Sequence, residues 1–382
     1  MKYRLIEEDK EFCELKKKWS CLLEHSGQGN PFLTWEWMYS WWLSYQEERA
    51  PKRLSIIVAE EGTEIYAILP GFIKRERIGA FQLLTFHLMG TEFVTTNYLE
   101  IICRKPSDTE IIFSLMNFLL TQKPDLDVVT ISHILDDHPQ LAALKRIANK
   151  FKLELYLDHY HTCLYIPIND TWDNYLQGLS KNTRYNWRRY LRGLQNQFQA
   201  EFERVDNYDE VDHAIDDLFD LHQKRFRAKK SDTFFRSKVK KNFHKEVARK
   251  FFQRGILDIF QLKVNHKPIA IYYCFQYSDQ MHFFQSGMDP NWDKYSPGFV
   301  LLGMIIRYSF EKDLKEFDFG RGTDSYKLKW NPVSREMMAM SLGISKKGKI
   351  ALSSLKGIDH IKDRIKKHIP KKGWNIMREF LH

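Results

Sequence analysis

A short run near the C-terminal end of the chain, DFGRGTDSYKLKW, concentrates side chains that bind ions or move protons. It brings together Asp318, Arg321, Asp324, Tyr326, Lys327 and Lys329, and its two glycines let the main chain turn sharply. The run follows an expected strand, and α/β proteins build sites where strands end. We therefore predict a functional site here. The alternative is a charged surface loop with a solvated salt bridge.

A second candidate is the tripeptide Ser296-Pro297-Gly298. Serine at an N-cap and proline at the first helical position are strong signals for the start of a helix, and Gly298 allows close approach to the first turn. Free N–H groups and a positive dipole end can hold a phosphate there without charged side chains. A simple helix cap explains the same residues.

A third candidate is the segment SKNTRYNWRRYLRGL. On a helix, Lys181, Arg188 and Arg192 share one face, Arg184 and Arg189 flank it, and Trp187 lies on the buried face. Guanidinium groups in such a ridge suit phosphate or carboxylate groups of a substrate. A solvated helix face is the alternative.

The charge is unevenly distributed along the 382 residues. The chain carries a net charge of +10, and its acidic residues outnumber its basic ones before residue 180 while the reverse holds after it. The basic half suggests an anionic partner, such as a phosphorylated donor, RNA or an anionic lipid surface. Five scattered cysteines without CxxC pairs indicate free thiols and no metal site. A charged N-terminus without a signal-peptide core predicts a cytoplasmic protein.

The elements that must position these candidates form two α/β units in tandem. Tryptophan-rich helices over 10–46 precede a hairpin at LSIIVAEEGTEIYAILP. Later elements of this unit are expected at 81–88 and 98–103 (strands), 108–120 (helix), 127–132 (strand), 139–150 (helix) and 152–157 (strand). The stripe of Trp35, Met38, Trp41 and Trp42 is typical of a core.

The second unit repeats this order. Its elements are expected at 161–168 (strand), 172–194 (helical), 198–205 (strand), 208–226 and 234–254 (helices), 256–288 (three strands with turns at 265–266 and 278–279), 296–311 (helix), 316–320 and 337–344 (strands). Beyond residue 345 the basic tail has apolar residues at helical spacing: Leu355, Ile358, Ile361, Ile365 and Ile369. We expect an amphipathic helix packed on the second unit. A membrane- or RNA-binding helix is the alternative.

Together these segments resemble the BioF2-like acetyltransferase domain of the GNAT superfamily, which also occurs in CelD-like proteins and is related to the Fem aminoacyltransferases. The matching segments are LSKNTRYNWRRYLRGL, VNHKPIAIYYCF, SGMDPNWDKYSPGFVLL and DFGRGTDSYKLKW. The resemblance covers residues 166–345 and extends more weakly over the first unit through NPFLTWEWMYSWW and TTNYLEIIC.

The resemblance implies mixed sheets flanked by helices in two tandem GNAT-like folds. It implies a structural or substrate-wall domain at 1–165, a catalytic domain at 166–345 and a basic tail at 346–382. Acyl-CoA, in the simplest case acetyl-CoA, would be the donor and an amine the acceptor. The Gln/Arg-x-x-Gly-x-Gly/Ala phosphate loop of common acetyltransferases is absent, and TTNYLE carries asparagine where relatives often have aspartate.

The resemblance also suggests roles for the candidates. Ser296, Pro297 and Gly298 would lie near the phosphates of the donor. Lys327 would contact substrate. From their own chemistry, and not from the resemblance, we assign Arg321, Arg188 and Arg192 to substrate binding, Tyr326 as general acid, and Asp318 as a base or the organiser of its loop. His266 and His282 are interpreted as turn and strand residues.

The expected chemistry is direct attack of the amine on a thioester, with main-chain N–H groups of a splayed strand stabilising the oxyanion. Two alternatives remain open at this point. One is a Fem-like transferase that uses aminoacyl-tRNA and a cell-wall precursor. The other is a non-catalytic module that binds a glycan or a nucleotide-sugar.

Overall fold

The computed structural model describes residues 1–48, 52–94, 96–228, 230 and 232–368 of the chain. The first half opens with helices that carry the tryptophan stripe and continues with the expected hairpin. Its elements are β1 (Lys2–Ile6), α1 (Asp9–Glu14), α2 (Lys16–Ser26), η1 (Pro31–Leu33), α3 (Trp35–Glu48), β2 (Lys52–Leu54), β3 (Ile56–Glu61), β4 (Glu64–Leu69), β5 (Gly71–Ile78), β6 (Phe81–Leu88), β7 (Ile102–Cys103), α4 (Thr109–Gln122), β8 (Val128–Leu135), α5 (Pro139–Lys150) and β9 (Glu154–Pro167).

The second half follows the predicted order closely. Its elements are α6 (Trp172–Gly178), α7 (Lys181–Phe198), β10 (Glu201–Arg204), η2 (Tyr208–Glu210), α8 (Val211–Ala228), η3 (Phe234–Arg236), α9 (Lys238–Gln253), β11 (Leu257–Val264), β12 (Lys267–Tyr277), β13 (Gln280–Met288), η4 (Pro290–Tyr295), α10 (Pro297–Glu311), β14 (Glu316–Arg321), α11 (Ser325–Leu328), β15 (Val333–Gly343) and α12 (Lys346–His368). Asn265, His266 and Ser278 have positive φ, which confirms the two predicted turns.

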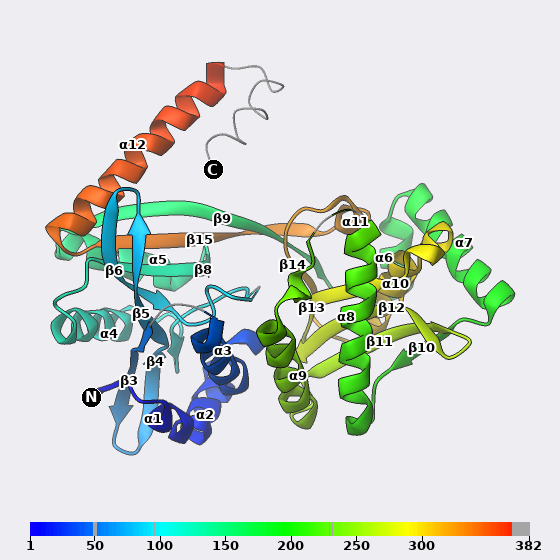
Figure 1. Cartoon of the computed structure of the whole chain (residues 1–382), viewed down its shortest axis with the longest axis horizontal. Coiled ribbons are helices and arrows are strands. Elements are labelled where there is room, and N and C mark those ends of the chain that lie inside the picture. Colours follow the sequence, from blue (N-terminus) through cyan, green and yellow to red (C-terminus); the bar gives the residue numbers. More distant parts are fainter. Residues whose placement is uncertain (49–51, 95, 229, 231, 369–382) are drawn as a thin grey trace.

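One large mixed sheet joins the halves, in the strand order β10-β11-β12-β13-β14-β9-β15-β8-β6-β5-β2. A smaller sheet, in the order β1-β3-β4-β7, belongs entirely to the first half. In Figure 1 the two halves lie side by side, and the long strands β9 and β15 run between them. The predicted fold class, mixed α/β with helices flanking mixed sheets, is confirmed.

The same sequence of elements occurs in each half. In the first, the antiparallel hairpin β5–β6 is followed by α4 and by β8, which lies parallel to β6. In the second, the hairpin β12–β13 is followed by α10 and by β14, which lies parallel to β13. The last strands are exchanged, because β9 pairs with β14 and β15 pairs with β8. This exchange ties the two repeats into one sheet.

The strand β9 corrects one expectation. Two separate strands, over 152–157 and 161–168, were expected because the polar residues 158–160 between them look like a loop. The structure has a single strand. In its middle the side chains are exposed to solvent, while the main chain pairs with β15. Polar side chains are compatible with a strand when their face meets water.

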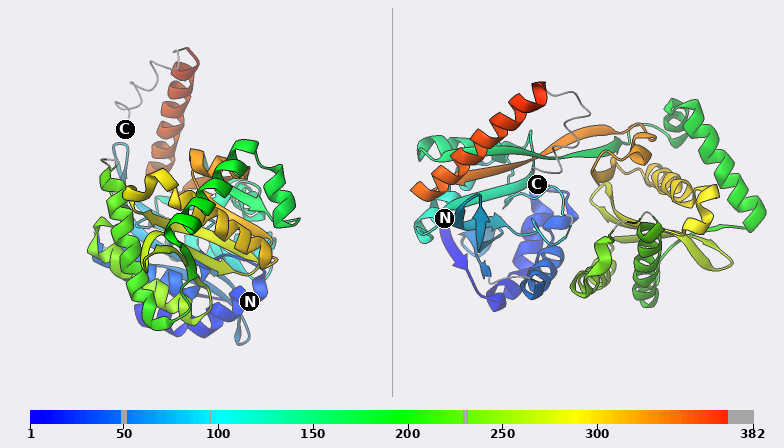
Figure 2. Two further views of the ribbon diagram at one scale, coloured as in Figure 1. Left: turned by 90° about the vertical axis from the view of Figure 1, so that its right-hand side faces the viewer. Right: turned by 45° about the horizontal axis from the view of Figure 1, so that its top comes forward.

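The tail corrects another expectation. The helix α12 begins directly after β15 and packs on the first half, not on the second. Ala351 and Leu352 are buried against Leu83 of β6 and Val128 of β8. Gly343 at the end of β15 pairs with Val128, so the chain enters α12 at the first half's edge. Ile358, Ile361, Ile365 and Ile369 fall outside the described side chains. Figure 2 shows α12 projecting from this half.

The core extends across the two halves. Trp35, Met38, Trp41 and Trp42 are at most 5% exposed, as the stripe predicts. The neighbouring Trp37 packs edge-on against Phe243 of α9. The main apolar cluster therefore includes the first half and the helices α8 and α9, whereas a second cluster lies between α7, α10 and the strands β11–β13.

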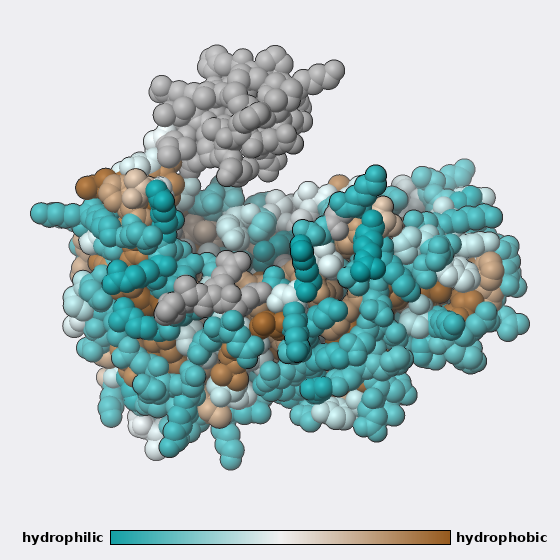
Figure 3. Space-filling model, viewed as in Figure 1, coloured by the Kyte–Doolittle hydropathy of each residue, from teal (hydrophilic) through white to brown (hydrophobic). Residues whose placement is uncertain are grey.

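None of the described helices is both long and apolar enough to cross a bilayer. The face drawn in Figure 3 is largely hydrophilic, with apolar residues in small separate areas.

Candidate active site

The parallel strands β13 and β14 separate shortly after they begin. They pair over only three residue pairs, from Gln280–Glu316 to His282–Asp318. Beyond Asp318 the strand β14 continues along β9, while β13 stays beside β12. Across this opening the two strands no longer pair with each other. Main-chain groups at such a separation must bind other partners in the protein, water or a ligand.

A cavity of about 310 Å³ occupies this opening. Its walls come from β13, β14 and the loop after it, α8 and one residue of the first half. The lining residues are Asn97, His222, Arg225, Phe226, Phe283, Phe284, Gln285, Ser286, Phe319, Gly320, Arg321, Asp324, Tyr326 and Lys327. The predicted residues Arg321, Tyr326 and Lys327 thus share one cavity.

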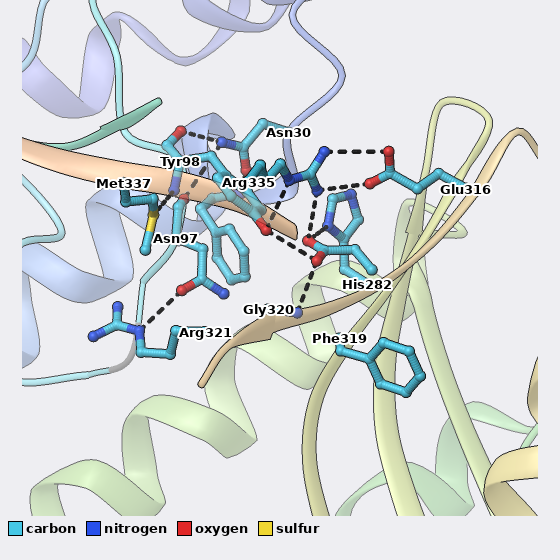
Figure 4. Close-up of polar contacts among 12 residues, drawn as sticks. Asn30, Asn97, Tyr98, His282, Glu316, Phe319, Gly320, Arg321, Arg335 and Met337 are labelled. Carbon is cyan, nitrogen blue, oxygen red and sulfur yellow. Dashed lines mark hydrogen bonds and ion pairs between the residues drawn. The ribbon is translucent and has the colours of Figure 1, made fainter. Parts of the chain in front are cut away.

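The point where the strands separate is held by a buried network around Asp318 (Figure 4). The Asp318 carboxylate accepts hydrogen bonds from the Tyr98 hydroxyl at 2.9 Å and from the Gly320 N–H at 2.7 Å. Arg335 of β15 lies 3.4 Å from the same carboxylate and 2.6 Å from that of Glu316. Residues from the first half, β14 and β15 therefore meet at one buried carboxylate.

Electrostatics keep this carboxylate charged. Burial alone would raise the pKa of Asp318, but Arg335 and the hydrogen bonds from His282 and Gly320 lower it below its usual value. Glu316 has the opposite balance: burial raises its pKa despite Arg335. Asp318 is 1% exposed and does not line the cavity. This placement suits the predicted loop organiser better than the predicted base.

The loop after Asp318 bends at Gly320, where φ is +64°. A Cβ atom there would lie 2.7 Å from the Asn97 amide nitrogen, so glycine is required both for the backbone and for the space. Arg321 donates from Nε to the Asn97 side-chain oxygen at 3.0 Å and from Nη2 to the Thr96 carbonyl. The arginine therefore joins the site to the first half.

Lys327 lies on α11 with only 3% of its surface exposed. Its ammonium group donates to the carbonyl oxygens of Phe319, Arg321 and Gly322, at 3.2, 2.6 and 3.2 Å. Burial lowers its pKa. Because three main-chain carbonyls take its donors, Lys327 fixes the shape of the loop in this structure.

Tyr326 is the predicted general acid, and its side chain lines the cavity. Burial, with a smaller contribution from Asp324, raises its pKa above the usual value. The hydroxyl therefore keeps its proton at neutral pH and can donate a hydrogen bond to a ligand.

The Ser296-Pro297-Gly298 turn lies elsewhere. Ser296 lines a separate cavity of about 520 Å³, on the other side of α11, together with Ser180, Asn186 and Lys329. The two cavities share no lining residue. Ser325 lines the cavity that contains Ser296, whereas Tyr326 and Lys327 line the cavity between β13 and β14. Ser296 and Lys327, which the resemblance assigns to donor and substrate, therefore line different cavities.

The start of α10 also differs in detail. Pro297 is the first helical residue, as predicted, but Ser296 is left-handed, with φ of 47°, and its side chain makes no cap hydrogen bond. Gly298 is buried, and a Cβ atom there would lie 2.3 Å from Met288 Cε. The glycine is thus required for packing against Met288, so it does not keep the turn open to a ligand.

The basic ridge of α7 points away from both cavities. Arg188 and Arg192 are exposed and line neither of them, whereas the pocket side of α7 carries Asn182, Asn186 and Tyr190. No carboxylate forms an ion pair with Arg188 or Arg192 within the described part of the chain.

Several lining residues were not among the predicted site residues, and the polar ones outside the charged run are Asn97, His222, Arg225, Gln285 and Ser286. A partial signal existed for two of them, since His222 and Arg225 are three apart on α8 and therefore share a face. Nothing local distinguishes Ser286 from other strand residues. The position of Asn97 had been noted only as a departure from relatives.

Comparisons with known proteins agree with this geometry. Residues 181–328 match the model of the family Acetyltransf_6, acetyltransferase (GNAT) domain. No curated protein matches the sequence significantly. Among solved structures, FemX aligns with a TM-score of 0.58 at 11% identity, over 89% of this chain and 97% of FemX.

Two further structures share the fold. A conserved protein from Bacteroides thetaiotaomicron aligns with a TM-score of 0.55 at 12% identity, over 89% of this chain and all of that one (100%). The C-terminal DUF2156 domain of an Agrobacterium fabrum protein, described as a candidate lysylphosphatidylglycerol synthetase, aligns with a TM-score of 0.53 at 10% identity, over 91% and 97%. The chain therefore carries a GNAT-superfamily acetyltransferase domain and has a fold shared with FemX.

Proposed function

We propose that this protein is an acyltransferase that moves an acyl group from acyl-CoA to an amine acceptor, and that the reaction takes place in the cavity between β13 and β14. The observation that carries the proposal is the separation of these two parallel strands inside the matched GNAT domain. The separation opens the sheet next to a neutral tyrosine and a preorganised loop, and we assign stabilisation of the oxyanion to main-chain N–H groups at this opening.

In the proposed reaction the amine nitrogen attacks the thioester carbonyl carbon. A C–N bond forms, the C–S bond breaks, and the carbonyl oxygen carries negative charge in the tetrahedral intermediate. The nitrogen releases one proton to solvent water, and the departing thiolate gains one from a donor that solvent then reprotonates, so the amide and the free thiol are the net products. We assign Tyr326 as the donor of that proton, because its raised pKa keeps it protonated.

Other predicted residues receive supporting roles in this proposal. Asp318 and Lys327 position the loop, and Arg321 holds the first half against the site through Asn97. The first half, 1–165, then acts as one wall of the catalytic domain, 166–345. Ser296 remains our proposed contact for the phosphates of the donor, with Lys329 in the same cavity. Pro297 and Gly298 would contribute through the shape of this turn.

The cavity of about 310 Å³ has room for the acyl end of the donor, and the proposed reaction requires no covalent enzyme intermediate. Acyl-CoA is made and used in the cytoplasm, so we propose that the protein acts there. We also keep the BioF2-like and CelD-like relationship as a proposal, since the comparisons support the superfamily and the Fem-like fold.

The experiment has two readouts. Purified protein should gain thermal stability with acetyl-CoA or a longer acyl-CoA and should release free thiol when a suitable amine is present. Tyr326→Phe should slow thiol release at least tenfold while the stabilisation by acyl-CoA persists. Tyr185→Phe, at a residue that is 57% exposed on α7, is the matched control. A protein that neither binds acyl-CoA nor releases thiol would contradict the proposal and favour a non-catalytic glycan or nucleotide-sugar module.

A Fem-like reaction is the second candidate. It is favoured by the fold shared with FemX and by the unpaired, exposed arginines of α7. Under this alternative the donor is an aminoacyl-tRNA, the acceptor a cell-wall precursor, and the affinity for tRNA falls steeply with salt. Arg188→Gln with Arg192→Gln should then reduce that salt dependence. Salt-independent or undetectable tRNA binding would exclude it.

A further inference from the structure

The cavity between β13 and β14 has an excess of positive charge. Arg225, Arg321 and Lys327 line it, and Asp324 is its one lining carboxylate. The side chain of Asp324 is 61% exposed and lies 3.8 Å from the Lys327 ammonium. A site with this balance of charge favours an anionic ligand group.

The three cations differ in what they bind. Lys327 donates to three carbonyl oxygens, and Arg321 donates to Asn97 and to Thr96. Arg225 of α8 makes one long contact, from Nη1 to the Ser286 hydroxyl at 3.5 Å. Within the described part of the chain, no carboxylate lies within ion-pair distance of Arg225. Its guanidinium is therefore the lining cation with the most donors left for a ligand.

Arg225 also lies close to the residues that would act on the acyl group. Its charge opposes the effect of burial on Tyr326 and on Tyr272, where it lowers the pKa, and it adds to the effect of burial on His222. A half-buried guanidinium so placed gains from a counter-ion. Beside it, Phe226, Phe283, Phe284 and Phe319 offer apolar surface.

We propose that the acceptor is an amino acid or an amino-acid-like amine, and that Arg225, assisted by the Ser286 hydroxyl, binds its carboxylate. The planar fork of Arg225 matches one carboxylate in a bidentate pair. The aromatic walls receive the apolar part of the acceptor, and the amine faces the gap between the strands. This inference rests on the proposed acyl transfer and names its substrate class.

The anionic group belongs to the acceptor and not to the donor. In acyl-CoA a long uncharged arm separates the thioester from the phosphates. An anion beside Tyr326 therefore lies too close to the thioester end to come from the nucleotide part of the donor. The alternative, that Arg225 binds a donor phosphate, is tested separately below.

The test uses the full chain, acetyl-CoA and matched acceptors: the free amino acids, each compared with its C-terminal amide. We expect the best free amino acid to have a KM at least tenfold below that of its amide. Arg225→Gln should remove this difference by raising the KM of the acid and leaving that of the amide, with little change in kcat. Arg225→Lys, which keeps the charge, should retain part of the preference.

Two controls separate folding and donor effects. Arg227→Gln changes an exposed arginine on the same helix and should leave both KM values unchanged. S-acetyl-N-acetylcysteamine replaces acetyl-CoA as a donor without phosphates. If the loss in Arg225→Gln disappears with this donor, Arg225 serves the donor and the inference is overturned.

The remaining outcomes are also decisive. Equal use of acids and amides, or equal losses for both in Arg225→Gln, would overturn the inference and leave acyl transfer standing. If no amine is acetylated, thermal shifts with free amino acids decide. Stabilisation of the wild type but not of Arg225→Gln would retain the carboxylate site and reject the transferase, and no stabilisation would reject both.

Discussion

In the first half of the sheet, β6 and β8 run parallel over three residue pairs and then diverge, as β13 and β14 do in the second half. The chain itself occupies the first opening. The Leu99 N–H donates to the His133 carbonyl on β8 at 2.8 Å, and the Leu99 side chain lies against Gly90, just after β6. The second opening holds the cavity described above.

The segment that fills the first opening also builds the second. Its residues Asn97 and Tyr98 extend to Arg321 and Asp318 across the junction. The first repeat therefore has no free opening of its own, and its filling segment contacts the residues beside the opening of the second repeat. The difference teaches that duplicating a fold duplicates the strand geometry but not the cavity, because a loop of the first repeat, between β6 and β7, fills one opening and leaves the other free.

The largest expected effect comes from the junction. Arg335→Met removes the cation that compensates Asp318 and Glu316, two buried carboxylates. We expect the free energy of unfolding to fall by about 3–5 kcal/mol, because a buried charge then lacks its partner. Urea denaturation measures this, and a loss below about 1 kcal/mol would show that the network does not hold the halves together.

Emptying the filled opening should come next. Leu99 is 1% exposed, and Leu99→Ala should cost about 2–5 kcal/mol through the cavity it leaves. Leu157→Ala, at a residue 39% exposed on β9, is the matched control. Chemical denaturation of both variants compares them. Equal stability of the two would mean that Leu99 does not fill the first opening.

Lowering the pH should destabilise the protein through His222 of α8, which lines the cavity between β13 and β14. Burial, with a smaller contribution from Arg225, lowers the pKa of His222 from its ordinary value of 6.5 to about 4. The unfolded chain therefore takes up a proton between pH 6.5 and 4 while the folded one does not, so stability falls as the pH falls through this range. The contribution is at most about 3 kcal/mol.

The measurement is the unfolding free energy of wild type and His222→Gln at several pH values. The variant should lose less stability between pH 6.5 and 4 than the wild type. Parallel curves would show that His222 is free to protonate in the folded state.

Filling the cavity between β13 and β14 should greatly reduce acyl transfer and should lower the free energy of unfolding less than the two core variants do. Ser286 is 5% exposed and faces the cavity, so Ser286→Phe places a ring where ligand is proposed to bind. We expect acyl transfer to fall at least a hundredfold, which corresponds to about 2.7 kcal/mol. Ser286→Ala leaves the volume open and should retain most of the turnover. Full activity in Ser286→Phe would place the reaction elsewhere.

Most elements were predictable from local pattern. The hairpins, the tryptophan stripe and the helix at Pro139–Lys150 follow from periodicity, turn residues and proline. The density of charge in DFGRGTDSYKLKW predicted a functional site, and its residues Arg321, Tyr326 and Lys327 line one cavity in the structure. Ser296-Pro297-Gly298 correctly predicted the start of α10. The packing around α11, which residues far apart in the chain determine, places Ser296 in a different cavity from Lys327.

The sequence by itself determined where helices and strands begin, which faces are buried and that a cluster of ionisable residues follows one strand. These properties depend on residues a few positions apart. Only the tertiary structure decided that β9 and β15 are exchanged, that residues 96–101 fill one opening, and that Arg225 faces the other. Each of these depends on contacts between residues far apart in the chain, and no local spacing encodes such contacts.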